Sequence, residues 1–117
     1  MVVDEDRFAE LVGEALDLLP ERLLAAMDNV VVLVDDAHPD EPDLLGLYEG
    51  VALTERTSDY GGGGGVLPDR ITLYRLALAA HCEDDDELRE EVAVTVVHEI
   101  AHHFGIDEQT LHRLGWG

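Results

Sequence analysis

The amino-acid sequence predicts an α/β (α+β) protein that forms one domain. Apolar residues recur at three- and four-residue spacing near both ends of the chain, which is the pattern of helices with one apolar face. Short runs of β-branched and alternating residues lie between these segments, as expected for strands. The length of 117 residues is typical of one compact domain, so we expect residues 1–117 to share a single core.

The first third of the chain predicts two helices and a strand. A helix is expected from about Asp4 to Leu19, with acidic residues at its amino end where negative charge suits the helix dipole. Pro20 breaks this helix, and Glu21–Met27 can form a second short one. The β-branched run Val30–Val34 is short and continuous, which predicts a buried strand.

The middle of the chain contains loops and at least one strand. Residues 35–43 are polar and include two prolines, which indicates a loop. Val51–Leu53 is a candidate short strand, and the five glycines Gly61–Gly65 predict a flexible loop. Arg70–Arg75 alternates between polar and apolar residues, as a strand does.

The last third predicts a long helix, opened by the acidic run Glu83–Glu87 and continuing to Phe104; we call its main part, about residues 85–104, the active-site helix. Gly105 is placed to end it in a left-handed cap. Three apolar residues then suggest a final short helix or turn that covers the core: Leu111, Leu114 and Trp116.

Charge and composition exclude several classes of partner. The chain has 7 basic residues, all Arg, against 27 acidic residues, for a net charge of −20. Such a surface repels phosphate backbones and anionic lipids, so we expect no nucleic-acid and no membrane partner. Cys82 is the only cysteine, and the acidic first residues do not resemble a secretory signal. We therefore expect a cytoplasmic protein.

The residues best suited to chemistry are in the active-site helix, where His98-Glu99-Ile100-Ala101-His102 fits the pattern H-E-x-x-H. Histidines four residues apart lie on the same face of a helix, and two imidazoles at that spacing can bind one tetrahedral Zn²⁺. Glu99 can then act as the general base toward a metal-bound water. Apolar residues surround the motif on nearly all sides, which predicts a buried helix with its remaining face opening into a cleft.

A catalytic zinc site needs a third protein ligand. The motif continues as H-E-x-x-H-x-x-G-x-x-acid, the ligand spacing of metzincins, and this spacing places Glu108 at the third position. Asp107 and His112 are the alternatives, because only ligand type and spacing favour Glu108. The methionine turn of metzincins has no counterpart, since the only methionines are Met1 and Met27.

From residue 46 onward the chain resembles a family of small, mostly bacterial, zincin-like metallopeptidases. The segments that carry the resemblance are Gly46–Gly50, Leu67–Tyr74, Thr95–Glu108 and Leu111–Trp116. The resemblance implies a minimal zincin-like fold, with a small mixed β-sheet packed with helices and zinc held by the active-site helix. It also implies a peptidase activity assigned from the motif more than from a known substrate.

The sequence therefore predicts a zinc-dependent metallopeptidase, with Glu99 as the catalytic residue and His98, His102 and Glu108 as metal ligands. The expected partner is a peptide or protein substrate. Two other hypotheses stay open: a non-catalytic, zinc-containing acidic module that binds a cationic protein, and a zinc hydrolase that acts on a non-peptide amide.

Overall fold

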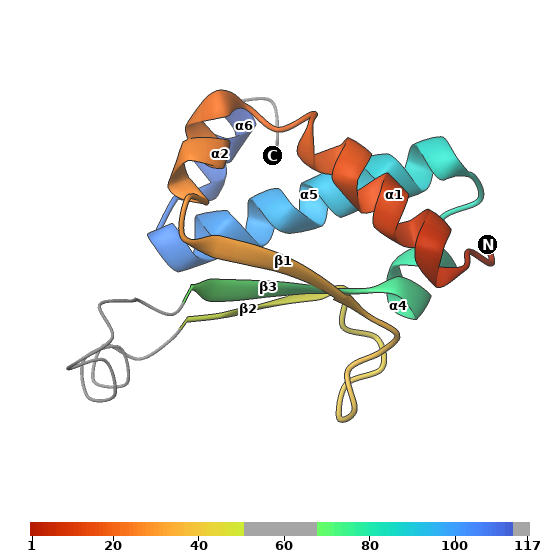
Figure 1. The fold of residues 1–117 in the computed structure, drawn as a ribbon. Coiled ribbons are helices and arrows are strands. Elements are labelled where there is room, and N and C mark those ends of the chain that lie inside the picture. The colour runs from red at the N-terminus through yellow and green to blue at the C-terminus, as the bar shows by residue number, and fades with distance from the viewer. Residues whose placement is uncertain (51–67, 114–117) are drawn as a thin grey trace.

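The structure is a computed structural model, and it describes residues 1–50 and 68–113. Figure 1 shows most of the helices on one side of a small sheet, with one short helix at the end of the sheet. In chain order, the described elements are α1 (Glu5–Leu16), α2 (Glu21–Ala26), β1 (Val30–Asp35), β2 (Gly46–Glu49), β3 (Asp69–Tyr74), α4 (Arg75–Ala80), α5 (Asp85–Phe104) and α6 (Glu108–Arg113). The α/β fold class is confirmed.

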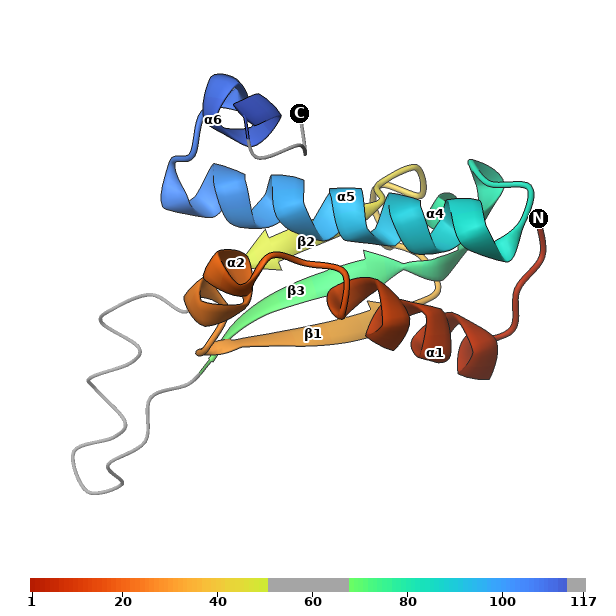
Figure 2. The same cartoon turned by 90° about the horizontal axis from the view of Figure 1, so that it is seen from above.

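The sheet is mixed and has the strand order β1-β3-β2. The central strand β3 pairs in parallel with β1, with Val30 opposite Asp69, and antiparallel with β2, with Gly46 opposite Leu73. Both β1 and β2 are therefore edge strands within the described part of the chain. β2 is the strand at the edge of the sheet near α5, the helix that contains the H-E-x-x-H motif, and it contacts this helix (Figure 2).

The two long helices, α1 and α5, begin after capping aspartates, and α5 ends at a glycine. Side chains of Asp4 and Asp84 accept hydrogen bonds from backbone N–H groups three residues later, which caps α1 and α5. Gly105 ends α5 with φ of 71°, the left-handed conformation that glycine adopts without strain. The predicted active-site helix thus has the bounds expected from the sequence, whereas α1 ends at Leu16, earlier than predicted.

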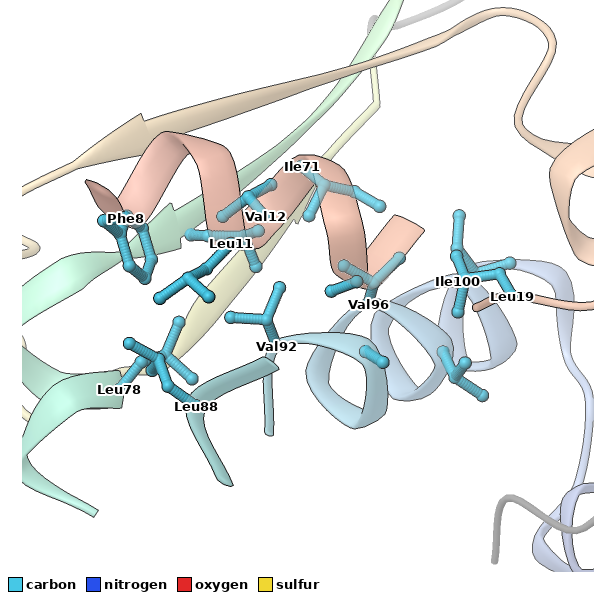
Figure 3. Close-up of a cluster of buried hydrophobic side chains, with 14 of the residues drawn as sticks. Phe8, Leu11, Val12, Leu19, Ile71, Leu78, Leu88, Val92, Val96 and Ile100 are labelled. Carbon is cyan, nitrogen blue, oxygen red and sulfur yellow. The ribbon is translucent and has the colours of Figure 1, made fainter. Parts of the chain in front are cut away.

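The hydrophobic core lies between the helices and one face of the sheet. α1 packs against α5, and both lie on the same side of the sheet (Figures 1 and 2). Figure 3 shows side chains from both helices and from β3 meeting in this layer. Its fully buried members include Phe8, Leu11, Ile71, Leu78, Leu88, Val92, Val96 and Ile100. This layer fixes the position of α5, and hence of the motif, against the sheet.

Two predicted features of the sheet region differ from the structure. The expectation that Val30–Val34 is a buried strand is wrong, because β1 is an edge strand and Val31, Leu33 and Val34 are 38–46% exposed. Arg75 does not end a strand but begins α4, a helix that the alternating pattern before it conceals. The predictions for Val51–Leu53 and Gly61–Gly65 lie outside the described residues.

No helix within residues 1–50 and 68–113 combines the length and the apolar character that a membrane crossing requires.

Candidate metal centre and cleft

The H-E-x-x-H residues occupy the last two turns of α5 and face a cavity. His98 and His102 lie one turn apart and are exposed. Glu99, which follows His98 in the sequence, is half-buried. All three line a cavity of about 530 Å³. The remaining lining residues are Asp43, Leu44, Leu45, Gly46, Glu91, Val94 and Thr95. We call this cavity the Glu91 lobe.

A second cavity of about 510 Å³ continues from the same residues toward the carboxyl end of α5. Its lining consists of Leu47, Tyr48, Glu99, His102 and His103, and we call it the Tyr48 lobe. Because Glu99 and His102 line both lobes, the two cavities meet at the motif. They form one cleft between β2 with its preceding loop and α5.

A glycine in β2 allows the strand to lie close to α5 beside the cleft. A Cβ atom at Gly46 would lie 2.9 Å from the Thr95 Cγ2 atom and 3.3 Å from the Thr72 carbonyl oxygen. Any larger residue would therefore push β2 away from α5. The close approach of strand and helix at this point sets the distance between the β2 backbone and the motif.

The electrostatics of Glu99 follow from its position. Burial raises the pKa of the Glu99 carboxyl, and the neighbouring His102 and His98 oppose this shift with smaller effects. A carboxyl group that is half-buried and faces a cavity beside two imidazoles has the environment of a general acid or base. No other acidic side chain lines both lobes of the cleft in the described part of the chain.

A polar cluster formed by Tyr48, Asp69 and His103 supports the wall of the Tyr48 lobe. The Tyr48 hydroxyl donates a hydrogen bond of 2.8 Å to Asp69 Oδ2, and His103 Nε2 lies 3.7 Å from the same oxygen. The Tyr48 and His103 rings stack with their centroids 3.9 Å apart. His103, the neighbour of a candidate ligand, thus packs against Tyr48 and Asp69 of the strands.

Sequence reasoning does not single out Asp69, because an aspartate at the start of a strand belongs to no motif. A signal is nevertheless present. Asp69 alternates with Ile71 and Leu73, so all three share the buried face of β3. A carboxylate in that register must be hydrogen-bonded, and it therefore points to a polar cluster.

The three candidates for the third ligand differ in their surroundings. Glu108 is the first residue of α6, and its side chain lies outside the described part of the structure. The Asp107 carboxylate accepts a hydrogen bond of 2.7 Å from the Thr110 backbone N–H, which lowers its pKa and caps α6. His112 is exposed in the last turn of α6. Among the described side chains, no three potential ligands form a metal-binding group.

The expectation that the active-site helix is buried nearly all round needs a correction. Val92, Val96 and Ile100 are fully buried, but His98 and His102 are exposed. The physical reason is that a cleft separates this side of α5 from β2 and the loop before it, so the two histidines face open space. The chemistry of the donors still fits zinc, because two imidazoles one turn apart open into the same cavity.

Comparisons with known proteins show the family and the fold of the chain. The model of the zincin-like metallopeptidase family matches residues 27–116. A solved structure of a conserved hypothetical protein from Thermus thermophilus is similar, with a TM-score of 0.56 and 21% sequence identity. The similarity covers 87% of this chain and 94% of that chain, and at this identity it shows the fold alone. No curated protein matches the chain.

Proposed function

The chain belongs to the zincin-like metallopeptidase family, and we propose that it is a zinc-dependent peptidase that uses the H-E-x-x-H residues of α5. The observation that carries this proposal is the placement of the motif in the cleft: His98, Glu99 and His102 all line the Glu91 lobe, and Glu99 and His102 also line the Tyr48 lobe. A motif placed on a closed surface would have no room for a substrate. Here the same residues border an open groove of substrate size.

Zinc would be held by His98 and His102, with Glu108 as the third ligand. Bound there, zinc supplies Lewis acidity and an acidified water. Glu108 is preferred over Asp107 because the Asp107 carboxylate already serves as the cap of α6. The turn at Gly105, with its positive φ, brings α6 back after α5 ends. This turn gives the first residue of α6 a route toward the motif.

Glu99 would serve as the general base. It follows His98 directly and is half-buried at the junction of the lobes, so its carboxylate can accept a proton from a water and pass it to a leaving amine. Its partial burial strengthens its interactions with a reacting group, because less water competes. A site whose only task was to hold a metal would have no use for an acid at this position.

The edge strand β2 supports a peptide as the substrate. Within the described sheet β2 pairs with β3 alone, so its other edge is available beside the cleft. Gly46 borders the Glu91 lobe, and Leu47 and Tyr48 border the Tyr48 lobe. An extended peptide can therefore add to β2 as a further strand and lie across the motif. A small non-peptide amide would make no use of this edge.

Hydrolysis of a mixed peptide library by the zinc-loaded protein tests the proposal. We expect cleavage that a chelator abolishes, and a loss of about 10²- to 10⁴-fold in Glu99→Gln with zinc content unchanged. Glu90→Gln is the matched control, because Glu90 is an exposed acid on the same helix and does not line the cleft. Full activity in Glu99→Gln would refute the assigned base. Cleavage of acyl amides but of no peptide would favour the other class of zinc hydrolase.

A further inference from the structure

We propose that the Glu91 lobe binds a basic side chain of the substrate, arginine or lysine, at a fixed distance from the motif. This inference rests on the proposed function and names the class of peptide that the cleft selects. It is carried by the position of two carboxylates, by the lining of the lobe that they share with the motif, and by a buried hydroxyl group.

The distance from Glu91 to the motif suits a side chain near the reacting bond. Glu91, Thr95 and His98 follow each other at four- and three-residue spacing, so they share one face of α5. His98 is the seventh residue after Glu91, which corresponds to about 10 Å along the helix axis. An extended peptide covers this length with about three residues.

The carboxylates of Glu91 and Asp43 border the lobe from opposite walls. Glu91 belongs to α5 and Asp43 to the loop before β2. Neither carboxylate forms an ion pair or a hydrogen bond with a described residue, and no described basic residue lines the lobe. The nearby Arg89 is already engaged by Asp86 and Glu14. The two acids therefore present negative charge that an external cation can meet.

The rest of the lobe suits the stem of a long basic side chain. Leu44, Leu45 and Val94 are half-buried and line the same lobe as the two carboxylates and the motif. Lysine and arginine place their methylene groups along apolar surface while the charged end reaches a polar group. A lobe lined by both apolar side chains and two carboxylates matches this division.

Thr95 supplies an independent sign of a ligand. It lines the lobe, is only 8% exposed, and its hydroxyl makes no hydrogen bond to a described residue. A buried hydroxyl without a partner costs free energy, and a bound molecule that completes its hydrogen bonding would account for it. A peptide lying over Thr95 on its way to Glu91 would provide that partner.

The test is equilibrium binding of fluorescent peptides to the zinc-loaded Glu99→Gln variant, which is expected to bind without turnover. The peptides share one neutral sequence and carry a single arginine, or its neutral counterpart citrulline, at successive positions. We expect about tenfold tighter binding for arginine at one position only, as two partly exposed ion pairs would give. Adding Asp43→Asn and Glu91→Gln should abolish this preference.

The matched control adds Asp40→Asn and Glu90→Gln, which remove the same charge from the same loop and helix at exposed positions outside the cleft. The control should keep the arginine preference. Equal loss of preference in both variants would overturn the inference, because general attraction to the acidic surface would then explain it. So would the absence of any preference.

Cleavage by the wild-type protein, measured on the same peptides, separates the two proposals. Cleavage without an arginine preference would overturn this inference and leave the peptidase intact. A position-specific preference in binding without any cleavage would refute the peptidase and support the lobe as a site for basic peptides.

Discussion

At the scale of single residues, the cleft combines exposed groups suited to chemistry with buried groups that hold its walls. His98 and His102 are exposed and can reach a ligand because they face the cleft. Asp69, in contrast, is buried, accepts a hydrogen bond from Tyr48 and lies beside His103. The first kind of residue is expected to affect zinc and activity. The second kind is expected to affect the stability of the wall.

The third zinc ligand can be identified by comparing neighbouring variants. Glu108→Ala should weaken zinc binding by more than about 100-fold, because even the loss of a group that only supports a ligand costs about 10- to 100-fold. Asp107→Asn should change zinc affinity little, since asparagine caps a helix about as well as aspartate. Competition with a chromophoric chelator measures both affinities. A larger loss in Asp107→Asn would transfer the ligand role to Asp107.

The buried carboxylate of Asp69 should contribute measurably to stability. Asp69→Asn weakens the hydrogen bond from Tyr48 and leaves an amide beside His103, so the free energy of unfolding should fall by about 1–3 kcal/mol. The exposed Asp28 is the control, and Asp28→Asn should change stability by less than about 0.5 kcal/mol. Urea unfolding monitored by circular dichroism checks both values. Equal effects would show that the cluster does not stabilise the fold.

At the scale of elements, the position of the motif depends on where α5 ends. Gly105 stops the helix three residues after His102 and turns the chain into α6, whose Leu111 is buried in the core. The sequence is sufficient to predict this end, because a glycine following a long apolar helix is a specific signal.

Replacing glycine by alanine at two positions isolates the effect of this turn. An added Cβ would meet no atom within 4 Å at Gly105 or at Gly13, so the two substitutions differ in backbone conformation and not in space. Gly105→Ala should cost about 1–2 kcal/mol, because alanine must adopt a positive φ. Gly13→Ala, inside α1, should stabilise by about 0.5–1 kcal/mol. Thermal unfolding measures whether each substitution raises or lowers the stability. If Gly105→Ala stabilised the protein as Gly13→Ala does, the left-handed cap would be contradicted.

Periodicity and caps allow the helices to be predicted better than the sheet. The bounds of α5 and the presence of α1, α2 and β3 follow from local patterns. The exposure of β1 does not, because a β-branched run looks the same in a central strand and in an edge strand. α4 is hidden for a related reason, since its residues continue the apolar run of β3.

The candidate site also contains residues that a local pattern predicts and residues that it does not. H-E-x-x-H is a local pattern, so His98, Glu99 and His102 can be identified from spacing alone. The other residues of the cleft come from distant parts of the chain: Asp43 lies before β2 and Tyr48 lies in it, and Asp69 at the start of β3 holds the Tyr48 hydroxyl. Their approach to α5 depends on strand order, which no local pattern encodes.

At the scale of the whole molecule, the charge of −20 on 117 residues disfavours the compact state through repulsion among like charges. The free energy of unfolding should therefore rise as sodium chloride is added. Most of the rise should occur below about 0.2 M salt, because the screening length drops below about 10 Å within this range. Urea titrations at several salt concentrations measure this. A stability that falls or stays constant over this range would show that ion pairs such as that of Arg7 with Asp85 outweigh or balance the repulsion.

The zinc content of the purified and reconstituted protein, measured by elemental mass spectrometry against protein concentration, tests the central claim most directly. We predict about one zinc per chain for the wild type, as a site with three protein ligands requires. His98→Ala and His102→Ala should each lose it, while His81→Ala, an exposed histidine far from the motif in sequence, should keep it. A wild-type protein that takes up no zinc would contradict the account. So would variants that keep zinc after His98 and His102 are replaced.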